Sequence, residues 1–569
     1  MRPADRATSL YFDYPRYPFT RPAELDGGAA PHPVVVVGAG PVGVTAALEL
    51  ARHGIASVVL DDKDTVNDGS RAICVARHSL EILQQLGLHD VFVRKALPWT
   101  HGTSYYRDKP VYRLEMPHSE QERFYPMYNL QQQYIERFLI DRAQSVPLVD
   151  LRWCSRLTGI QQDPGSVRMR VSTPQGDYDL RAQYVIAADG AKSATRHLLD
   201  LKLKGDAYEG RYVIVDIRMK SVHPTERRAF FDPASNPGLT ILVHRQPDDI
   251  WRIDYQLRAE DDEIEALREE TVRARIESIL GMLGEAGPWE LEWWSVYKAY
   301  TLALDDYRCR RVFFAGDAAH LVPIFGVRGL NSGFADAMNI GWKLARVLQG
   351  RAGDALLDSY SPERRGATLD VFANAVKSTR FMTPPTRGYQ LMRDAALSLS
   401  LKNEFSRPLI NPRQSQPYTY IDSPLTSYRD RDREFSCGPC AGAPLQNRKL
   451  ADGSWLLDHL GRGFTGLLFI HAGARDAAAL QVLMHDILAL EDGFRLLIII
   501  QGTDHNVPGN GKHGLSLADP DGNLFAAYGA GDRSFYLARP DRHICARWKE
   551  VAPDELKHAY LQANGRESP

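Results

Sequence analysis

A buried strand that runs directly into a glycine-rich turn constrains this chain more than any other feature. Four valines, Val34–Val37, precede the sequence Gly38-Ala-Gly40-Pro-Val-Gly43, and an Ala/Leu-rich segment through His53 follows. Glycines at this spacing let the backbone approach a pyrophosphate and let a helix pack close to its strand, while the first helical amides face the phosphates. The segment predicts a βαβ unit that binds a dinucleotide.

An acidic residue after the next predicted strand supports this interpretation. Ser57–Leu60 predicts that strand, and Asp61 ends it. A carboxylate at this place accepts a hydrogen bond from a ribose hydroxyl in dinucleotide-binding folds. A glycine-rich turn alone is weak evidence, since other α/β proteins contain such turns, but its place between strand and helix favours nucleotide binding.

Two further buried segments end in aspartate–glycine pairs. One ends in Asp189-Gly190, and the other, Arg311–Ala315, ends in Gly316-Asp317. By pattern alone the first is an ordinary turn. Carboxylates at the carboxyl ends of parallel strands nevertheless lie where α/β sheets bind ligands.

Length and composition exclude several classes. A chain of 569 residues is too long for one core and predicts two to four domains. The net charge of −2 and the absence of a basic block argue against nucleic acid or an anionic membrane as partner. No apolar run approaches the roughly 18–20 residues that cross a bilayer, and Met1–Asp26 lacks the apolar region of a signal peptide. We therefore expect a cytoplasmic protein.

Taken together, the three motifs and their order resemble the class A flavoprotein aromatic hydroxylases, the superfamily of para-hydroxybenzoate hydroxylase and phenol hydroxylase, from about residue 33 to 400. The resemblance implies an α/β fold: a Rossmann-like FAD-binding domain, an inserted antiparallel-sheet substrate domain and a C-terminal thioredoxin-like α/β domain. The expected divisions are an N-terminal extension (1–32), the FAD-binding domain in two parts (33–196 and 306–403), the antiparallel domain (197–305), a linker (404–440) and the thioredoxin-like domain (441–569).

The resemblance also assigns the cofactor site. Gly38, Gly40, Gly43 and Asp61 would hold the ADP half of FAD, and Asp189 with Gly190 would serve both FAD and NAD(P)H. The remaining residues that the resemblance places at FAD are Arg71 on the pyrophosphate side, Gln132 on the flavin side chain, and Gly316 with Asp317 on the ribityl chain.

The stretch Pro323–Asn331 leads into a predicted helix, Ser332–Gln349. Amides of Leu330 and Asn331, with Arg328 nearby, would stabilise the negative charge of reduced flavin. The alternative for this arginine is an ordinary solvated loop residue. The resemblance places the loop, including Pro323, Gly326 and Gly329, beside the flavin ring, although the sequence has Pro323-Ile324 and Val327-Arg328 where many members carry Pro-Pro and Gly-Gln.

Residues 200–300 mix β-branched, aromatic and charged residues between short turns, which predicts an antiparallel sheet with a ligand-facing side. Arg252 alternates with Trp251 and Tyr255, so the two sets face opposite sides. A tyrosine or histidine here, Tyr255 or His244, could polarise a phenolic hydroxyl. The alternative is that all are ordinary sheet residues. The catalytic candidates are Arg328, Pro323, Tyr255, His244 and Arg252.

The pair Cys437-Gly-Pro-Cys440 has the spacing of a thioredoxin redox site. Such a pair must follow a strand and open a helix, whereas this one follows a polar linker. The strand that should lead to it, Gly466–Ile470, has no cysteine after it. The last domain resembles the redox-inactive tail of phenol hydroxylase and 3-(3-hydroxyphenyl)propionate hydroxylase relatives, and we expect a packing or dimerisation role.

The resemblance implies a monooxygenase that takes hydride from NADH or NADPH, adds O₂ to FAD as a C4a-hydroperoxide and hydroxylates a phenolic ring. We expect a homodimer with no metal. An NAD-dependent dehydrogenase would leave the two aspartate motifs unexplained. A non-hydroxylating flavin oxidoreductase or a flavin-binding module stays an alternative, and substrate-dependent oxidation of NAD(P)H discriminates between them.

Overall fold

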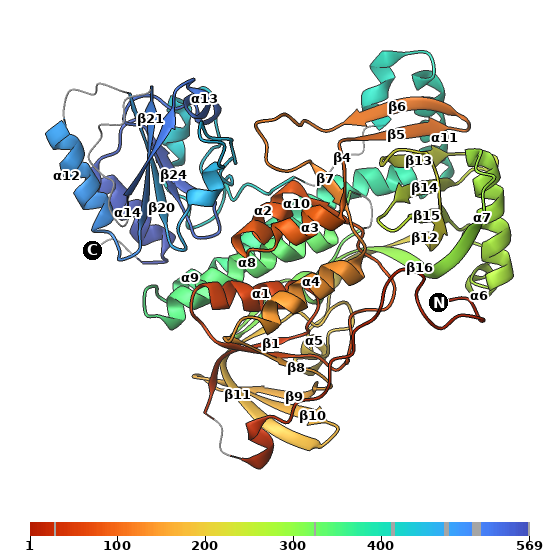
Figure 1. Cartoon of the computed structure of the whole chain (residues 1–569), viewed down its shortest axis with the longest axis horizontal. Helices are drawn as coiled ribbons and strands as arrows, with labels where there is room; N and C mark the ends of the chain where they lie inside the picture. The colour runs from red at the N-terminus through yellow and green to blue at the C-terminus, as the bar shows by residue number, and fades with distance from the viewer. Residues whose placement is uncertain (28–29, 324–325, 411–415, 472–476, 503–513, 567–569) are drawn as a thin grey trace.

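The computed structural model describes residues 1–569 except 28–29, 324–325, 411–415, 472–476, 503–513 and 567–569. Two large sheets and the helices between them form the body, and a third sheet forms a separate lobe at the C-terminal end (Figure 1). Within the described residues no helix is both long and apolar enough to cross a membrane. The same residues contain no cluster of metal-ligating side chains.

The first sheet brings the predicted motifs to one edge. Its strands run in the order β17-β18-β11-β1-β2-β8, and β1 (His32–Val37) pairs in parallel with β2 (Ser57–Leu60) and β11 (Gly176–Ala187). β18 (Val312–Phe314) pairs in parallel with β11. The parallel register therefore aligns the carboxyl ends of these strands. The other strands of this sheet are β8 (Val149–Arg152), β9 (Arg156–Gln162), β10 (Val167–Thr173) and β17 (Arg308–Cys309).

Two helices cross closely over this sheet, α1 (Pro41–Arg52) and α8 (Gly329–Leu348). A Cβ atom on Gly333 of α8 would clash with the side chain of Val42 in the first turn of α1. Small residues therefore bring the N-terminal ends of both helices to the same edge of the sheet. The predicted helix Ser332–Gln349 was placed too late, because Gly329, Leu330 and Asn331 form its first turn.

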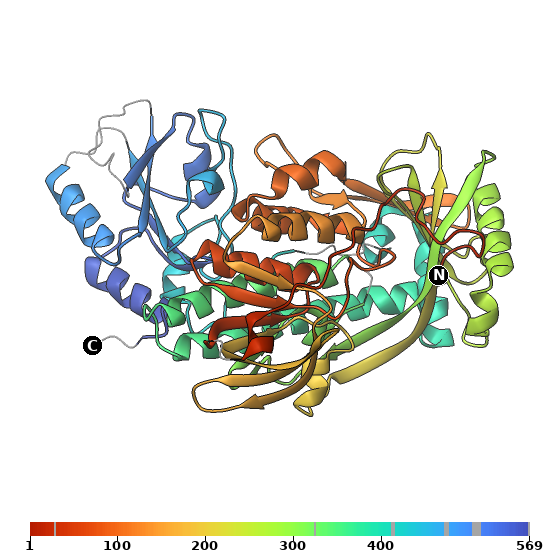
Figure 2. The same cartoon turned by 60° about the horizontal axis from the view of Figure 1, so that its bottom comes forward.

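The second sheet has the order β19-β16-β12-β15-β14-β13-β5-β6 and is antiparallel except for the β13–β5 pair. One face packs against α7 (Glu269–Leu283) through an apolar cluster. The opposite face turns toward the first sheet (Figure 2). Its strands are β5 (His101–Tyr106), β6 (Lys109–Glu115), β12 (Lys204–Met219), β13 (Arg227–Phe231), β14 (Thr240–Arg245), β15 (Ile250–Gln256), β16 (Trp289–Ala303) and β19 (His320–Leu321).

A three-stranded sheet and the remaining helices complete the body around the two large sheets (Figure 1). The strands are β3 (Cys74–Ala76), β7 (Met127–Asn129) and β4 (Leu97–Trp99), and the helices are α2 (Arg77–Gln85), α3 (His89–Lys95), α4 (Gln132–Gln144), α5 (Ala194–Leu198), α6 (Glu263–Ala266), α9 (Ala355–Asp358), α10 (Tyr360–Met382) and α11 (Arg387–Ser400).

The segment expected to be a linker is partly built into the core. Tyr420 and Leu425 are each 2% exposed, and the Tyr420 hydroxyl accepts a hydrogen bond from Arg364 of α10 (2.9 Å). Polar composition predicted a linker over residues 404–440. It missed this packing because Pro, Ser and Asp residues hide the few apolar anchors between them.

The C-terminal lobe is a five-stranded sheet, β22-β21-β20-β23-β24, with parallel and antiparallel pairs. The predicted strand Gly466–Ile470 is present as β20 (Thr465–His471), which pairs in parallel with β21 (Arg495–Gln501). The residues Ala472–Arg475 that follow β20 lie outside the described residues. The other elements are β22 (Gly514–Asp519), β23 (Phe535–Ala538), β24 (Ile544–Trp548), α12 (Ala477–Leu488), α13 (Asn523–Tyr528) and α14 (Pro553–Ala563).

Candidate functional site

The glycine turn after β1 lies against the Asp189-Gly190 strand end. Gly38 has φ +105°, and a Cβ there would lie 2.5 Å from the carbonyl oxygen of Ala188. An added Cβ on Gly40 or Gly190 would meet no atom within 4 Å. The turn is therefore closed on its inner side and open toward the edge, as a phosphate cradle requires.

Asp61 holds this turn in shape. Its Oδ2 accepts a hydrogen bond from the Ala39 amide (2.8 Å), and its Oδ1 accepts one from the Lys63 amide (3.0 Å). Burial raises the pKa of the carboxyl. Each oxygen keeps a lone pair, so the residue can also accept a ribose hydroxyl as predicted.

Asp189 organises the start of α5. Its oxygens accept hydrogen bonds from the hydroxyls of Ser193 (2.6 Å) and Thr195 (2.9 Å). Arg196, in the same helix, donates to the carbonyl of Ala318 (3.1 Å). This arginine ties the Asp189 turn to the Gly316-Asp317 turn. The sequence pattern gave no reason to single out Arg196.

Asp317 follows Gly316 in the turn after β18. Its side chain is exposed to solvent, yet surrounding protein raises its pKa by desolvation, while the charges of His320 and Arg71 act to lower it. The nearby Tyr297 hydroxyl on β16 donates to the carbonyl of Val322 (3.0 Å). A carboxylate that is accessible to solvent, with other protein groups close by, is suited to accept hydroxyl groups of a ligand.

The turn that carries Asp317 is fixed from behind. Gly316 has φ +58°, and its amide donates to Asp336 of α8 (2.9 Å). Asp336 also receives hydrogen bonds from His320 (2.8 Å) and Arg364 (2.6 Å). Burial acts to raise the pKa of Asp336, but the nearby Arg364 and His320 lower it to about 2. These contacts keep the turn rigid.

Gln132 holds the loop that carries Arg71. Its Oε1 accepts hydrogen bonds from the amides of Arg71 (3.2 Å) and Ala72 (3.1 Å), and its Nε2 donates to Glu136 (2.7 Å). The Arg71 side chain is exposed. The amide of Gln132 is thus largely occupied by protein, and its predicted contact with the flavin side chain stays a prediction.

The loop before α8 contains a strained residue. Val327 has φ +60°, which is unusual for a β-branched side chain. The Asn331 side chain donates to the Val327 carbonyl (2.7 Å), and its Oδ1 accepts from the Ala76 amide (2.9 Å). Asn331 thus stabilises the loop and ties it to β3. Pro323 is buried at the start of the loop, and Gly326 has φ +99°, whereas Ile324 lies outside the described residues.

Arg328 is buried, at 4% exposure, so the alternative of a solvated loop arginine is wrong. Its Nη1 donates to the carbonyl of Val371 in α10 (3.0 Å), and Asp370 is the acidic group that influences it. The side chain therefore contacts α10. The predicted effect of its charge on the flavin stays a prediction. Gly329, Leu330 and Asn331 begin α8, as a helix N-terminus facing the site requires.

The three catalytic candidates on the second sheet lie on two different faces of that sheet. Tyr255 lies in the apolar cluster beneath α7, with Arg275 over its ring, so placing it with the substrate was wrong. Arg252 and His244 are cross-strand neighbours on the other face. Arg252 binds Asp216 through two hydrogen bonds (2.8 and 2.7 Å) and also donates to the carbonyl of Ser70. Its guanidinium is occupied, so Arg252 positions the Ser70 loop and does not offer free donors.

His244 stays a candidate. It is 5% exposed, and its Nδ1 has no hydrogen-bond partner within the described residues. Burial, with the charges of Arg227 and Arg252, lowers the pKa of His244 to about 3. The ring is therefore neutral at physiological pH and can donate one hydrogen bond and accept another.

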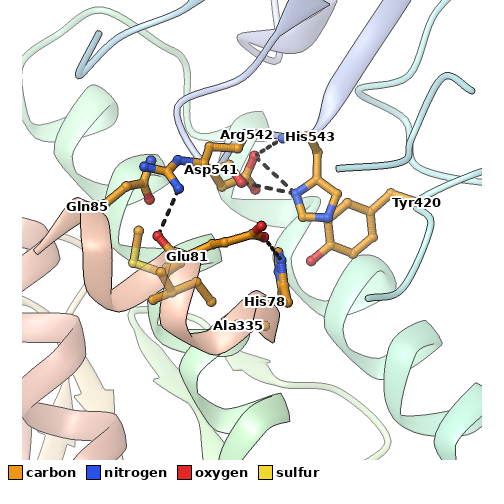
Figure 3. Close-up of a pocket in the computed structure, with 10 residues that line it drawn as sticks. His78, Glu81, Gln85, Ala335, Tyr420, Asp541, Arg542 and His543 are labelled. Atoms are coloured by element: carbon orange, nitrogen blue, oxygen red, sulfur yellow. Dashed lines mark hydrogen bonds and ion pairs between the residues drawn. The ribbon is translucent and has the colours of Figure 1, made fainter. Parts of the chain in front are cut away.

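A buried ionic network joins the C-terminal lobe to the body. Glu363 of α10 contacts Lys343 of α8 (2.7 Å) and Arg539 of the lobe, which also pairs with Asp541 (2.6 Å). Burial acts to raise the pKa of Glu363, but Arg539 and Lys343 lower it to about 2. Figure 3 shows the small pocket beside this network, where Asp541 and His543 face α2.

The residues at the edge fit FAD. The glycine cradle and α1 N-terminus suit a pyrophosphate, Asp61 suits a ribose, Asp317 suits the hydroxyls of a ribityl chain, and the first turn of α8 suits the electron-rich side of the ring. An added Cβ at Gly40 or Gly190 would project into open space, so these positions leave room for a ligand.

The FAD binding domain family matches residues 32–375. A 3-(3-hydroxy-phenyl)propionate/3-hydroxycinnamic acid hydroxylase of Mycolicibacterium smegmatis is 28% identical over 436 residues, 76% of each chain. Among solved structures, the flavin-dependent monooxygenase PieE with FAD and substrate superposes with a TM-score of 0.74 at 23% identity, covering 94% of this chain and 100% of that one. Aklavinone-11 hydroxylase with FAD and aklavinone gives 0.71 at 24% identity, with 95% and 100% covered. These two likenesses show the fold.

Proposed function

This chain belongs to the FAD binding domain family, and from that premise we propose how its residues divide the work of a flavin-dependent aromatic hydroxylase. The enzyme is an FAD-dependent monooxygenase, and the use of NAD(P)H and O₂ as co-substrates fits this family. FAD supplies the redox chemistry when it is bound. The chain supplies orientation, exclusion of water and local charge.

We assign the cofactor contacts as follows. The turn at Gly38, Gly40 and Gly43 receives the pyrophosphate, Asp61 the adenosine ribose and Asp317 the ribityl chain. Amides in the first turn of α8 face the ring. The single observation that carries the proposal is the parallel register, because it brings the carboxyl ends of four strands, β2, β1, β11 and β18, to one edge of the sheet.

The substrate we propose is a phenol that lies between this edge and the second sheet. His244 is the neutral hydrogen-bonding group on the sheet face, and Arg252 fixes the loop beside it. A relative that acts on 3-(3-hydroxyphenyl)propionate supports a phenolic ring with a short side chain.

The C-terminal lobe we propose to be thioredoxin-like and redox-inactive. Its mixed five-stranded sheet supports the fold. Cys437 is exposed, Cys440 is half-buried, and both are free thiols on a segment without a helix. Burial raises the pKa of the Cys440 thiol, which opposes formation of a reactive thiolate. The expected homodimer stays a prediction.

The function is tested by screening phenols, resorcinols and hydroxyphenylpropanoids for stimulated oxidation of NADH and NADPH, with product masses. We expect a product heavier by one oxygen atom for at least one phenol. Flavin-containing protein that oxidises neither nucleotide with any phenol would instead support a flavin-binding module without turnover.

A further inference from the structure

Arg227 of β13 is a buried cation to which the described part of the chain provides no partner. It is 6% exposed, and it forms no hydrogen bond or ion pair with any residue that the structure describes. Arg252, on the same sheet face, is fully engaged by Asp216 and two backbone carbonyls. The guanidinium of Arg252 is therefore occupied by protein groups, whereas that of Arg227 is able to bind a ligand.

Two more polar groups beside Arg227 lack partners. His244 is its direct cross-strand neighbour on β14, and Arg252 is the neighbour of His244 on β15. The Nδ1 of His244 and the Oδ1 of Asp254 are buried and accept or donate no hydrogen bond within the described residues. Three adjacent strands thus direct unsatisfied polar atoms to one face.

This face lies opposite the loop beside the cofactor edge. Burial lowers the pKa of Arg227, and the titratable groups near enough to act on it are the Cys74 thiol of β3 and Asp254. Cys74 belongs to a small apolar cluster with Trp99, Met127 and Val327. Arg227 therefore lies near a cluster of apolar and aromatic side chains.

An isolated buried cation costs several kcal/mol unless a partner compensates for its lost hydration. Asp254 does not serve as that partner, because no ion pair joins the two side chains. A planar guanidinium beside a neutral imidazole provides the donors that a carboxylate accepts in a bidentate manner. An anionic ligand group would satisfy them.

We propose that Arg227 binds an anionic substituent of the phenolic substrate, with His244 as a second donor, and so fixes which ring carbon faces the cofactor. The proposal rests on the proposed function and narrows it to phenols that carry a carboxylate. Arg227 acts in positioning and specificity and takes no part in the oxygen transfer.

The test compares matched acids and amides: 3-hydroxybenzoate, 3-hydroxyphenylacetate and 3-(3-hydroxyphenyl)propionate, each beside its neutral amide. Dissociation constants are measured on the flavin-loaded enzyme from the change in flavin absorbance, and product formation is measured separately. We expect the unaltered enzyme to bind at least one acid about ten- to a hundred-fold more tightly than its amide.

Arg227→Met should abolish this preference by weakening the acid alone, and Arg227→Lys should restore part of it. Arg228→Met is the matched control, since Arg228 is equally buried on the same strand but faces the opposite side, over the Trp251 ring. It should leave the preference unchanged.

Equal affinity of the unaltered enzyme for every acid and amide pair overturns the proposal, even if Arg227→Met fails to fold. Equal weakening of acid and amide by Arg227→Met also overturns it. Failure of the proposed function looks different, because then no phenol, charged or neutral, is hydroxylated by the unaltered enzyme.

Discussion

Buried charges are handled in opposite ways in two regions of this molecule. Around α8 and α10, Lys343, Glu363 and Arg539 neutralise one another at short range and are each at most 1% exposed in their side chains. On the second sheet, Arg227 and one oxygen of Asp254 are buried without such partners. The first arrangement stabilises the fold, whereas the second keeps hydrogen-bonding capacity for a ligand.

Of the predicted effects, we expect the largest to be the loss of stability when one of the paired charges is removed. Glu363→Gln leaves Lys343 and Arg539 buried without their anion, and breaking such a pair costs about 3–5 kcal/mol. We expect a clear fall in the thermal unfolding midpoint. Glu404→Gln, in an exposed pair with Arg407, is the control and should leave the midpoint unchanged. A Glu363→Gln protein as stable as the parent would show that the network contributes little.

A second prediction concerns the exposed carboxylate of the cofactor edge. Asp317→Ala removes hydrogen bonds to the ribityl chain, which at about 1.5–3 kcal/mol weakens FAD binding roughly ten- to a hundred-fold. The purified variant should be largely flavin-free, as measured by its absorbance ratio. Asp305→Ala, in an exposed pair with Lys204, is the control. A fully flavinated, active Asp317→Ala enzyme would show that the motif is wrongly assigned.

Arg328 tests whether a charge turned toward α10 still acts on the cofactor. Electrostatic effects at partly buried sites are about 1–3 kcal/mol, so Arg328→Ala should slow flavin reduction roughly ten- to a hundred-fold while FAD is retained. Arg328→Lys should recover the rate if charge alone matters. Anaerobic stopped-flow reduction with saturating substrate measures this. If Arg328→Ala keeps the parental reduction rate and flavin potential, Arg328 does not act on the flavin. The N-terminus of α8 would then be the source of the positive field.

The pH dependence of ligand binding tests the second region, where the buried charges are not paired. Burial raises the pKa of Asp254 to about 7, against the lowering effect of Arg252 and Arg227 and with the raising effect of Asp216. Since this folded-state pKa lies above that of unfolded aspartate, about 3.9, its contribution to stability is present below pH 4 and is lost as pH rises through 7.

An ionised Asp254 would also repel an anion beside Arg227. Affinity for an acidic phenol should therefore fall several-fold, by about 1 kcal/mol, as pH rises through 7. Of the other groups here, His244 has its pKa near 3 and Cys74 near 12, so neither titrates in this window. Affinity for the matched amide should stay constant, and Asp254→Asn should remove the slope. A slope that persists in that variant would assign the titration to another group.

The smallest expected effect lies in the C-terminal lobe. Cys437→Ser/Cys440→Ser should leave hydroxylation nearly unchanged, because neither thiol opens a helix that would lower its pKa. Turnover and flavin content of the double variant are measured together. Loss of most turnover with flavin content intact would make the lobe a redox partner.

The sequence predicts the cofactor edge far better than the substrate face, for a physical reason. Gly38, Gly43 and Asp61 act through backbone geometry within one βαβ unit, and local spacing is sufficient to specify that geometry. Arg227 becomes significant only through its neighbours on β14 and β15, and through the absence of a partner. Register and missing contacts are tertiary properties that no local pattern carries.

Alternation along β15 correctly predicted two faces but could not say which one is covered by a helix. Tyr255 was therefore placed with the substrate, although α7 covers it. The start of α8 was misplaced because glycine disfavours a helix, so the pattern excluded Gly329, while hydrogen bonds from Ala76 and Ser79 to Asn331 hold the first turn in place.

The ionic network also has a consequence for how the protein is made. Lys343 and Glu363 leave the ribosome long before Arg539, which completes their charge balance. Domains generally fold as units during synthesis, but here a buried part of the flavin-binding body is completed by a residue that is translated much later. We therefore expect flavin to be captured late: nascent chains stalled before residue 539 should retain little FAD, and chains stalled after the C-terminal lobe has emerged should retain it.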